Sequence, residues 1–362
     1  MNRILVIRLG ALGDVLRTLP AVWALRELHP AAQISWLVEP RSAGAVALCP
    51  AVDEVLLFPR DDLSGLLRTG RLGGLARLLK DLLLQLRRPG FDWVLDFHGL
   101  LKSGVLSWLT GAPLRVGYAP PQAREFSWLF NTRRVELPRP YCSRFERNQA
   151  LVADLGAGEP PAGSPLGVPA SAEQRMRRAL AEESGALLLH PGTSEPAAHK
   201  RWPAERFAEL AQRAAATLGR PCLVLAGPGA ADAELQGRVV EASQGGACRA
   251  PETKSLADLA ALLDSGSAFV GADSGPLHMA SLLGTPVVQL LGPTDPIHNA
   301  PYAGTAWRRA HVPVACSPCR HGCAAVQCMK ALSVDLVWNE LQALWQQVSP
   351  MDTIRPVQGG VA

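Results

Sequence analysis

The chain has 362 residues, about twice the length of a common domain, which predicts two domains. Hydrophobic residues make up 48% of it and charged residues 19%, a balance that excludes wholesale disorder. The net charge of +4 is too small to indicate a nucleic-acid partner. No run of about 18 apolar residues is present and the amino terminus lacks the apolar core of a signal peptide, so we expect a cytoplasmic protein.

Strand and helix patterns alternate along the first half of the chain. The apolar run Arg3–Arg8 predicts a buried parallel strand, and a glycine-containing turn at 10–14 follows it. Val15–Leu28 has the apolar stripe of a helix, which Pro20 breaks or restarts. Further strands are predicted at Gln33–Val38, Glu54–Phe58 and Asp92–Phe97. This alternation is typical of a doubly wound parallel sheet.

A stretch rich in Gly, Pro, Ala and Ser, Leu155–Ala172, is linker-like, and the alternation resumes after it. The predicted strands of the second half are Ala186–His190, Pro221–Ala226, Ala268–Ala272 and Val287–Leu291. Its predicted helices are Pro203–Leu218, Ser255–Leu263, Pro276–Leu283 and Ser333–Val348. We therefore predict an α/β protein with domains at 1–165 and 166–348, two Rossmann-like sheets facing a central cleft, and a flexible tail at 349–362.

The turn after the first predicted strand is a candidate ligand site. Gly10 and Gly13 lie in it, but the third glycine of the dinucleotide fingerprint is missing, which disfavours a dehydrogenase that binds NAD. Asp14 begins the following helix. Its carboxylate either favours the helix dipole or serves as a general base at the carboxyl edge of the sheet.

The segment HPGTSEPAAHKRWP, residues 190–203, combines hydroxyls and cations after a strand. Thr193 and Ser194 offer hydrogen-bond donors, and Lys200 and Arg201 precede the next helix. Donors and cations at the carboxyl end of a strand suit a phosphate or pyrophosphate. The alternative is an ordinary solvated loop.

The segment 269–296 contains a second candidate anion site. Asp273 follows a strand, and the helix that begins near Ser274 and Gly275 points its first N–H groups toward the same place. Asp273 is suited to accept hydrogen bonds from sugar hydroxyls. His278, on that helix, is either a packed core residue or part of the site.

Two further features are independent of these sites. Four cysteines lie within thirteen residues, and their spacing leaves three alternatives open: a structural metal, two disulfides or free thiols. They are Cys316, Cys319, Cys323 and Cys328. The segment Leu63–Arg88 alternates leucines with basic residues, which predicts either a helix lying on an anionic membrane or a core-facing helix with a solvated basic side.

Three of these segments together resemble the ADP-heptose:lipopolysaccharide heptosyltransferase family, glycosyltransferase family 9. They are GDVLRTLPA near the amino terminus, HPGTSEPAAHKRWP, and GADSGPLHMASLLGTPVVQLLGPTDP, and the resemblance extends from about Met1 to Val348. It implies a GT-B fold and inverting transfer of heptose from ADP-heptose to Kdo-lipid A or a heptosyl acceptor, with no cofactor required for catalysis. It also implies peripheral contact with the cytoplasmic face of the inner membrane.

The resemblance also assigns roles to single residues. Asp14 matches the general base and Lys200 the cation near the donor phosphates. Asp273, Ser274, Gly275, His278, Thr193 and Ser194 match the donor side, and Lys102 and Arg124 match acceptor-side segments more weakly. Two other functions stay open: a nucleotide-sugar epimerase or hydrolase with a GT-B fold, and a non-catalytic homologue that binds nucleotide or lipid.

Overall fold

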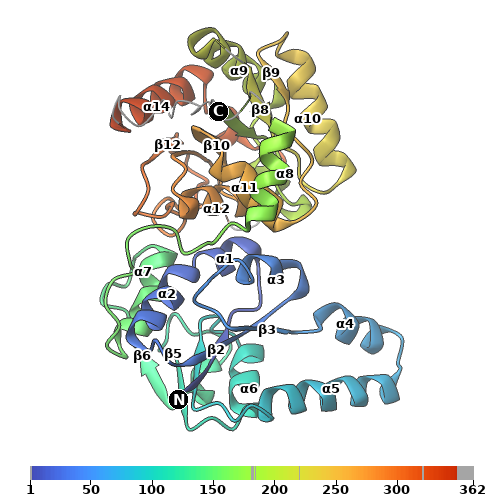
Figure 1. Ribbon diagram of the computed structural model, residues 1–362, viewed down its shortest axis with the longest axis vertical. Helices are drawn as coiled ribbons and strands as arrows, with labels where there is room; N and C mark the ends of the chain where they lie inside the picture. Colours follow the sequence, from blue (N-terminus) through green and yellow to red (C-terminus); the bar gives the residue numbers. More distant parts are fainter. Residues whose placement is uncertain (1, 181–182, 184, 220, 320–321, 349–362) are drawn as a thin grey trace, which may run out of the picture. The chain divides into compact units, whose positions relative to one another are not determined.

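The computed structural model describes residues 2–180, 183, 185–219, 221–319 and 322–348, and the predicted tail at 349–362 lies outside them. The chain divides into two compact units, Met1–Gly167 and Val168–Ala362. Each unit contains one six-stranded parallel sheet with helices packed around it (Figure 1). None of the helices in the described ranges is long and apolar enough to cross a membrane.

The sheet of the first unit has the strand order β3-β2-β1-β4-β5-β6, and all its strands are parallel. The strands are β1 (Arg3–Ile7), β2 (Gln33–Val38), β3 (Glu54–Leu57), β4 (Trp93–Asp96), β5 (Leu114–Tyr118) and β6 (Arg133–Val135). The helices are α1 (Leu12–Leu16), α2 (Leu19–Leu28), α3 (Pro40–Val46), α4 (Arg60–Arg68), α5 (Leu72–Arg87), α6 (Leu101–Leu109) and α7 (Arg144–Ala153), with a short 3-10 helix η1 (Ser127–Phe130). The central strand β1 is buried from its second residue onward, because helices cover both faces of a parallel sheet.

Two helical predictions in this unit differ in detail from the structure. The helix predicted at Val15–Leu28 is two helices, and Pro20 lies in the first turn of α2, where its missing N–H costs no hydrogen bond. The segment Leu63–Arg88 is also two helices. Gly70 lies between α4 and α5 with φ +65°, a left-handed conformation that ends a helix.

The sheet of the second unit has the order β12-β11-β10-β7-β8-β9, again all parallel. Its strands are β7 (Leu187–His190), β8 (Cys222–Val224), β9 (Ala247–Arg249), β10 (Ala268–Ala272), β11 (Val287–Leu291) and β12 (Trp307–His311). Its helices are α8 (Ala170–Leu180), η3 (a 3-10 helix, Glu195–Lys200), α9 (Ala204–Leu218), α10 (Ala230–Ala242), α11 (Leu256–Asp264), α12 (Gly275–Leu283), α13 (Gln327–Lys330) and α14 (Val334–Gln347). The predicted serine cap is confirmed at Ser255, whose hydroxyl accepts the N–H of Asp258 at 3.1 Å.

Both sheets have the same topology. The first three strands run outward from the centre in one direction, and the next three run outward in the other. The direction changes between β1 and β4 in the first unit and between β7 and β10 in the second. In open parallel sheets, ligands bind beyond the carboxyl ends of the strands at this switch point. The predicted pair of Rossmann-like sheets is confirmed. The loops after β1 and β4 in the first unit, and after β7 and β10 in the second, are therefore the candidate ligand sites.

Candidate active site

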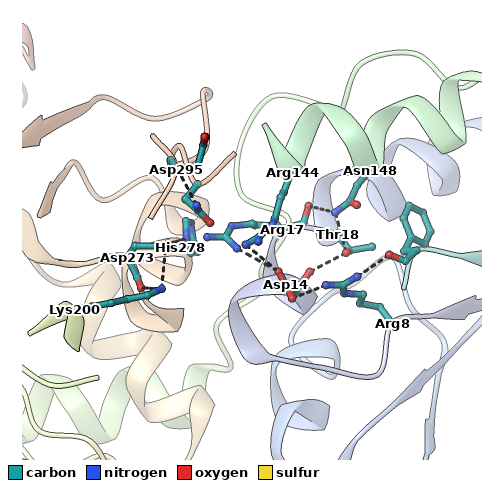
Figure 2. A network of polar contacts seen from close by, with 12 residues as sticks. Arg8, Asp14, Arg17, Thr18, Arg144, Asn148, Lys200, Asp273, His278 and Asp295 are labelled. Carbon is teal, nitrogen blue, oxygen red and sulfur yellow. Dashed lines mark hydrogen bonds and ion pairs between the residues drawn. The ribbon is translucent and has the colours of Figure 1, made fainter. Parts of the chain in front are cut away.

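Arginines surround Asp14 at the switch point of the first unit (Figure 2). Arg8, which follows β1 directly, places Nη2 2.5 Å from Oδ2 of Asp14. Arg17, at the end of α1, and Arg144, the first residue of α7, lie 3.3 and 3.5 Å from Oδ1. These three ion pairs hold the carboxylate in place. The side chain of Asp14 is 25% exposed, so the carboxylate is still open to solvent.

The charge state of Asp14 follows from these neighbours. Burial alone raises the pKa of this carboxyl, but the positive charges of Arg8, Arg144, Arg17 and Arg147 outweigh that effect. They hold the pKa of Asp14 well below its usual range. The side chain is therefore an ionised carboxylate at neutral pH, the state in which a general base accepts a proton.

A chain of buried hydrogen bonds ties the helix of Asp14 to α7. The hydroxyl of Thr18 donates to the main-chain carbonyl of Asp14 at 2.9 Å and accepts from the amide of Asn148 at 3.0 Å. The hydroxyl of Tyr118 donates to Oδ1 of Asn148 at 2.8 Å. The guanidinium of Arg147 lies over the Tyr118 ring, 4.8 Å from its centroid. These contacts fix α7, and with it Arg144, against the turn that carries Asp14.

The second loop at this switch point is organised by Asp96, the last residue of β4. Its fully buried carboxylate accepts hydrogen bonds from the N–H groups of His98 and Gly99, at 2.9 and 3.1 Å. It also accepts one from the hydroxyl of Ser103 at 2.8 Å. One side chain thus shapes the turn and holds the first residues of α6 against it.

Replacing Asp96 by Ala leaves these buried donors without an acceptor. We expect the free energy of unfolding to fall by about 1–3 kcal/mol, the cost of unsatisfied buried hydrogen-bond donors. Chemical denaturation of the variant and the unchanged chain measures the difference. An unchanged midpoint and slope would show that the loop does not depend on this carboxylate.

His98 lies in the same loop. Both of its ring nitrogens are buried and have no hydrogen-bond partner within the described ranges. Burial, together with the positive charges of Arg8 and Lys102, lowers the pKa of His98 to about 3, and the opposing effect of Asp14 is smaller. His98 is therefore a neutral imidazole whose hydrogen-bonding capacity is not used by the described residues. A ligand hydroxyl is a group that would satisfy it.

The two predicted acceptor residues have different surroundings. Nζ of Lys102, on α6, lies 3.6 Å from the buried carboxylate of Glu39. The main-chain N–H of Arg124 donates to the carbonyl of Gly99 at 2.9 Å, and the Arg124 side chain is exposed. The structure thus brings Arg124 to the His98 loop, whereas part of the charge of Lys102 is balanced by Glu39.

In the second unit, three of the predicted residues form one cluster. Asp273 directly follows β10, and its Oδ2 lies 3.0 Å from Nζ of Lys200, which comes from the end of η3 (Figure 2). Its Oδ1 lies 3.0 Å from Nε2 of His278, on α12. Asp273 and His278 are buried, whereas the side chain of Lys200 is 20% exposed. Lys200 is therefore the member best placed to contact a ligand. His278 lies on the buried side of Asp273 and positions its carboxylate.

Two groups of hydroxyls lie on the loops that follow β7 and β10. Ser274 is the residue before α12, which begins at Gly275, and its hydroxyl is buried without a hydrogen-bond partner in the described part of the chain. The first N–H groups of a helix attract an anion. Thr193 is buried and donates to the carbonyl of Ala197 at 2.9 Å, whereas Ser194 is exposed. Thr193 therefore shapes its loop, and Ser274 and Ser194 have hydroxyls to offer.

The arginine cluster around Asp14 was not predicted from the sequence. Arg17 and Arg144 belong to segments far apart in the sequence, so no spacing connects them. One local sequence signal, at the start of α7, could have indicated part of this cluster. Ser143 and Glu146 form a reciprocal capping box, with hydrogen bonds of 3.1 and 2.8 Å, at the start of α7. It places Arg144 and Arg147 on the first turn of that helix.

Two Rossmann-like units in one chain, each with charged side chains at the switch point of its sheet, are the architecture of the GT-B class. A profile of glycosyltransferase family 9 (heptosyltransferase) matches residues 80–330. The chain belongs to this family.

Relatives and solved structures are consistent with this assignment. The chain is 30% identical over 334 residues to lipopolysaccharide heptosyltransferase 1 of Pseudomonas aeruginosa, covering 88% of this chain and 86% of that protein. It is 26% identical over 309 residues to the lipopolysaccharide core heptosyltransferase OpsX of Haemophilus influenzae, covering 82% and 81%. The fold is shared with a family 9 glycosyltransferase from Veillonella parvula, at a TM-score of 0.75, 22% identity and coverage of 96% and 97%. The E. coli heptosyltransferase WaaC with ADP gives a TM-score of 0.74, 23% identity and coverage of 94% and 99%.

Proposed function

We propose that this protein transfers heptose from ADP-heptose to an acceptor of the lipopolysaccharide inner core. Transfer proceeds with inversion and without a catalytic metal ion. Membership of family 9 and relatives named as lipopolysaccharide heptosyltransferases support the donor and acceptor classes. The observation that carries the proposal is the ionised Asp14 at the switch point of its sheet, surrounded by arginines.

The reaction requires one proton acceptor and a stable leaving group. The oxygen of an acceptor hydroxyl forms a bond to the anomeric carbon, and the bond from that carbon to the β-phosphate oxygen breaks. The electron pair of that bond leaves with ADP. Asp14 takes the hydroxyl proton as the nucleophile attacks.

The arginines around Asp14 suit an anionic acceptor. Kdo-lipid A and its heptosylated forms carry carboxylates and phosphates, which pair well with guanidinium groups. Arg144 is 39% exposed and is the cluster member most open to such a group. An acceptor anion at Arg144 would weaken its pairing with Asp14 and raise the basicity of Asp14 when the acceptor is in place. Lys102 and Arg124 are proposed as further acceptor contacts.

The donor is assigned to the second unit. Lys200 and the first turn of α12, near Ser274 and Gly275, stabilise the charge that develops on departing ADP, which makes a metal ion unnecessary. Asp273 orients the sugar by accepting a hydroxyl hydrogen bond. The Thr193–Ser194 loop contributes hydrogen-bond donors from the end of β7.

Product analysis tests this function. The purified chain is incubated with ADP-heptose and either Kdo-lipid A or its monoheptosylated form, and the acceptors are examined by mass spectrometry and NMR. We expect one heptose to be added to one of these acceptors, with the anomeric configuration opposite to that of the donor. Retained configuration, or free heptose as the only sugar product, would contradict the proposed transferase.

A membrane surface is proposed as a second partner, bound through α4 and α5. The two helices extend away from the rest of their unit (Figure 1). Leu67 and Leu72 are 63% and 74% exposed, and Leu79 and Leu84 are about half exposed. Basic residues lie among these leucines: Arg68, Arg71, Arg77, Lys80, Arg87 and Arg88. Exposed leucines with basic neighbours suit the surface of an anionic membrane, such as the cytoplasmic face of the inner membrane.

Cosedimentation with vesicles tests the membrane contact. We expect binding to phosphatidylglycerol vesicles and little binding to phosphatidylcholine vesicles. The double variant Leu67→Ser/Leu72→Ser should bind these vesicles at least about tenfold more weakly, because two apolar contacts with the membrane are lost. Ile297→Ser removes another exposed apolar side chain, in the second unit, and serves as the matched control. Equal binding by the double variant and the control would contradict the assignment to α4 and α5.

A further inference from the structure

The four clustered cysteines meet a histidine from a distant segment. Cys316, Cys319, Cys323 and Cys328 line one small pocket together with His199, which belongs to η3. Cys316 and Cys323 are exposed and Cys328 is buried, so these are not four ordinary core residues. The eight cysteines of the chain, all within the described residues, are free thiols in the structure.

The main chain packs closely around this pocket at two glycines. A Cβ atom on Gly322 would lie 2.5 Å from Cγ of His199, and one on Gly292 would lie 3.0 Å from Sγ of Cys328. Neither position has room for a side chain. The cysteine-bearing loop is therefore pressed against η3 on one side and against the loop after β11 on the other.

Hydrogen bonds attach the cysteine-bearing loop to the loop after β11. The hydroxyl of Ser317 donates to the carbonyl of Gly292 at 2.7 Å, and the N–H of Cys319 donates to the carbonyl of Pro293 at 2.6 Å. Arg309, on β12, holds the same loop from its other end by donating to the carbonyl of Pro296 at 2.6 Å. The part of the segment that carries Cys316 and Cys319 is thus attached to the loop after β11.

We propose that Cys316, Cys319, Cys323 and Cys328 bind one Zn²⁺ ion through their thiolates. Four soft thiolates are a preferred ligand set of zinc, and they complete a tetrahedron with no position left for substrate, so the site is structural. In the arrangement described, no three Cys, His, Asp or Glu side chains yet converge as ligands. Neutral thiols do not attract one another, whereas a Zn²⁺ ion binds the thiolates that form as each cysteine loses its proton.

The site lies next to two loops of the proposed donor side, so zinc binding should also affect the donor. This step rests on the proposed function. His199 is the neighbour of Lys200 on η3, and Gly292 begins the loop at the carboxyl end of β11. A zinc ion at the cysteines would brace both loops at the donor edge of this sheet. We expect removal of zinc to weaken ADP binding, because Lys200 loses its firm support.

Metal analysis of the purified full chain, kept under mild reduction, tests the site. We expect about one zinc per chain. Replacing the zinc by Co²⁺ should produce the absorption bands of tetrahedral cobalt thiolate. The variant Cys316→Ser/Cys319→Ser should lose the zinc and these bands, whereas Cys248→Ser, which removes a cysteine outside the cluster, should keep both.

Three results would overturn the site. They are a zinc content far below one per chain in the unchanged protein, equal zinc in the double variant and the control, and disulfides between these cysteines in peptide maps of the non-reduced chain. Circular dichroism of the double variant shows whether it is folded. None of these measurements depends on sugar transfer, so they remain decisive if the proposed activity fails. Unchanged ADP affinity after zinc removal would contradict the bracing of Lys200.

Discussion

Replacing Asp14 by Asn is expected to lower the rate of heptose transfer by about 10²- to 10⁴-fold, the contribution of a well-placed general base. The amide keeps the shape of the side chain but cannot accept the proton of the acceptor hydroxyl. Binding of ADP should be unchanged, since the proposed nucleotide contacts lie on the second unit. The turnover number at saturating donor and the affinity for ADP, measured by calorimetry, check the two parts separately.

A matched control separates this effect from a general loss of charge. Asp335 is an exposed carboxylate that also pairs with an arginine, Arg213, but lies on α14 of the second unit. Asp335→Asn should retain full turnover. Asp14→Asn also leaves the buried Arg8 and Arg17 with less compensation, so its thermal unfolding must be recorded beside its activity. Undiminished turnover by folded Asp14→Asn would refute the general-base role.

The second large effect is expected at Lys200. Lys200→Ala should lower kcat/KM by about 10²- to 10³-fold, as the loss of a charge that stabilises a leaving group typically does. ADP affinity should fall as well. The variant also leaves Asp273 with His278 as its remaining partner among the contacts described above, so the carboxylate is less well compensated.

Conservative and distant replacements make the Lys200 test specific. Lys200→Arg keeps the charge and should recover part of the lost kcat/KM. Lys254→Ala removes an exposed lysine of the same unit that does not pair with Asp273 in the described residues, and it should behave like the unchanged chain. If folded Lys200→Ala binds ADP and turns over as before, Lys200 does not contact the donor phosphates.

Much of the fold could be predicted because buried strands and capped helices leave local signals. The apolar run of β1 and the serine before α11 are of this kind. Four strands were not predicted, because each is partly exposed and carries at least one arginine: β5, β6, β9 and β12. Without them the strand order of either sheet could not be written down, although the alternation of strands and helices was clear.

The candidate site was predictable in part for the same reason. Asp273 directly follows a predicted strand and Asp14 lies at the end of the turn after another, so their place at a carboxyl edge follows from local sequence alone. The partners that set their chemistry come from elsewhere in the chain. Arg144 reaches Asp14 only through the packing of α7, and the contact of His199 with the cysteine loop depends on the fold of its unit. The resemblance to family 9 added roles for these residues, which the Asp14 and Lys200 variants test.

The most direct test of the proposed activity follows release of ADP from ADP-heptose in the presence of EDTA, with and without Kdo-lipid A or its monoheptosylated form. The proposed transferase predicts rapid ADP release that requires one of these acceptors and does not increase when Mg²⁺ is added in excess of the chelator. Equal release with no acceptor would indicate hydrolysis and contradict transfer. Loss of release in EDTA that returns with added Mg²⁺ would contradict the metal-independent stabilisation of ADP by Lys200 and the first turn of α12.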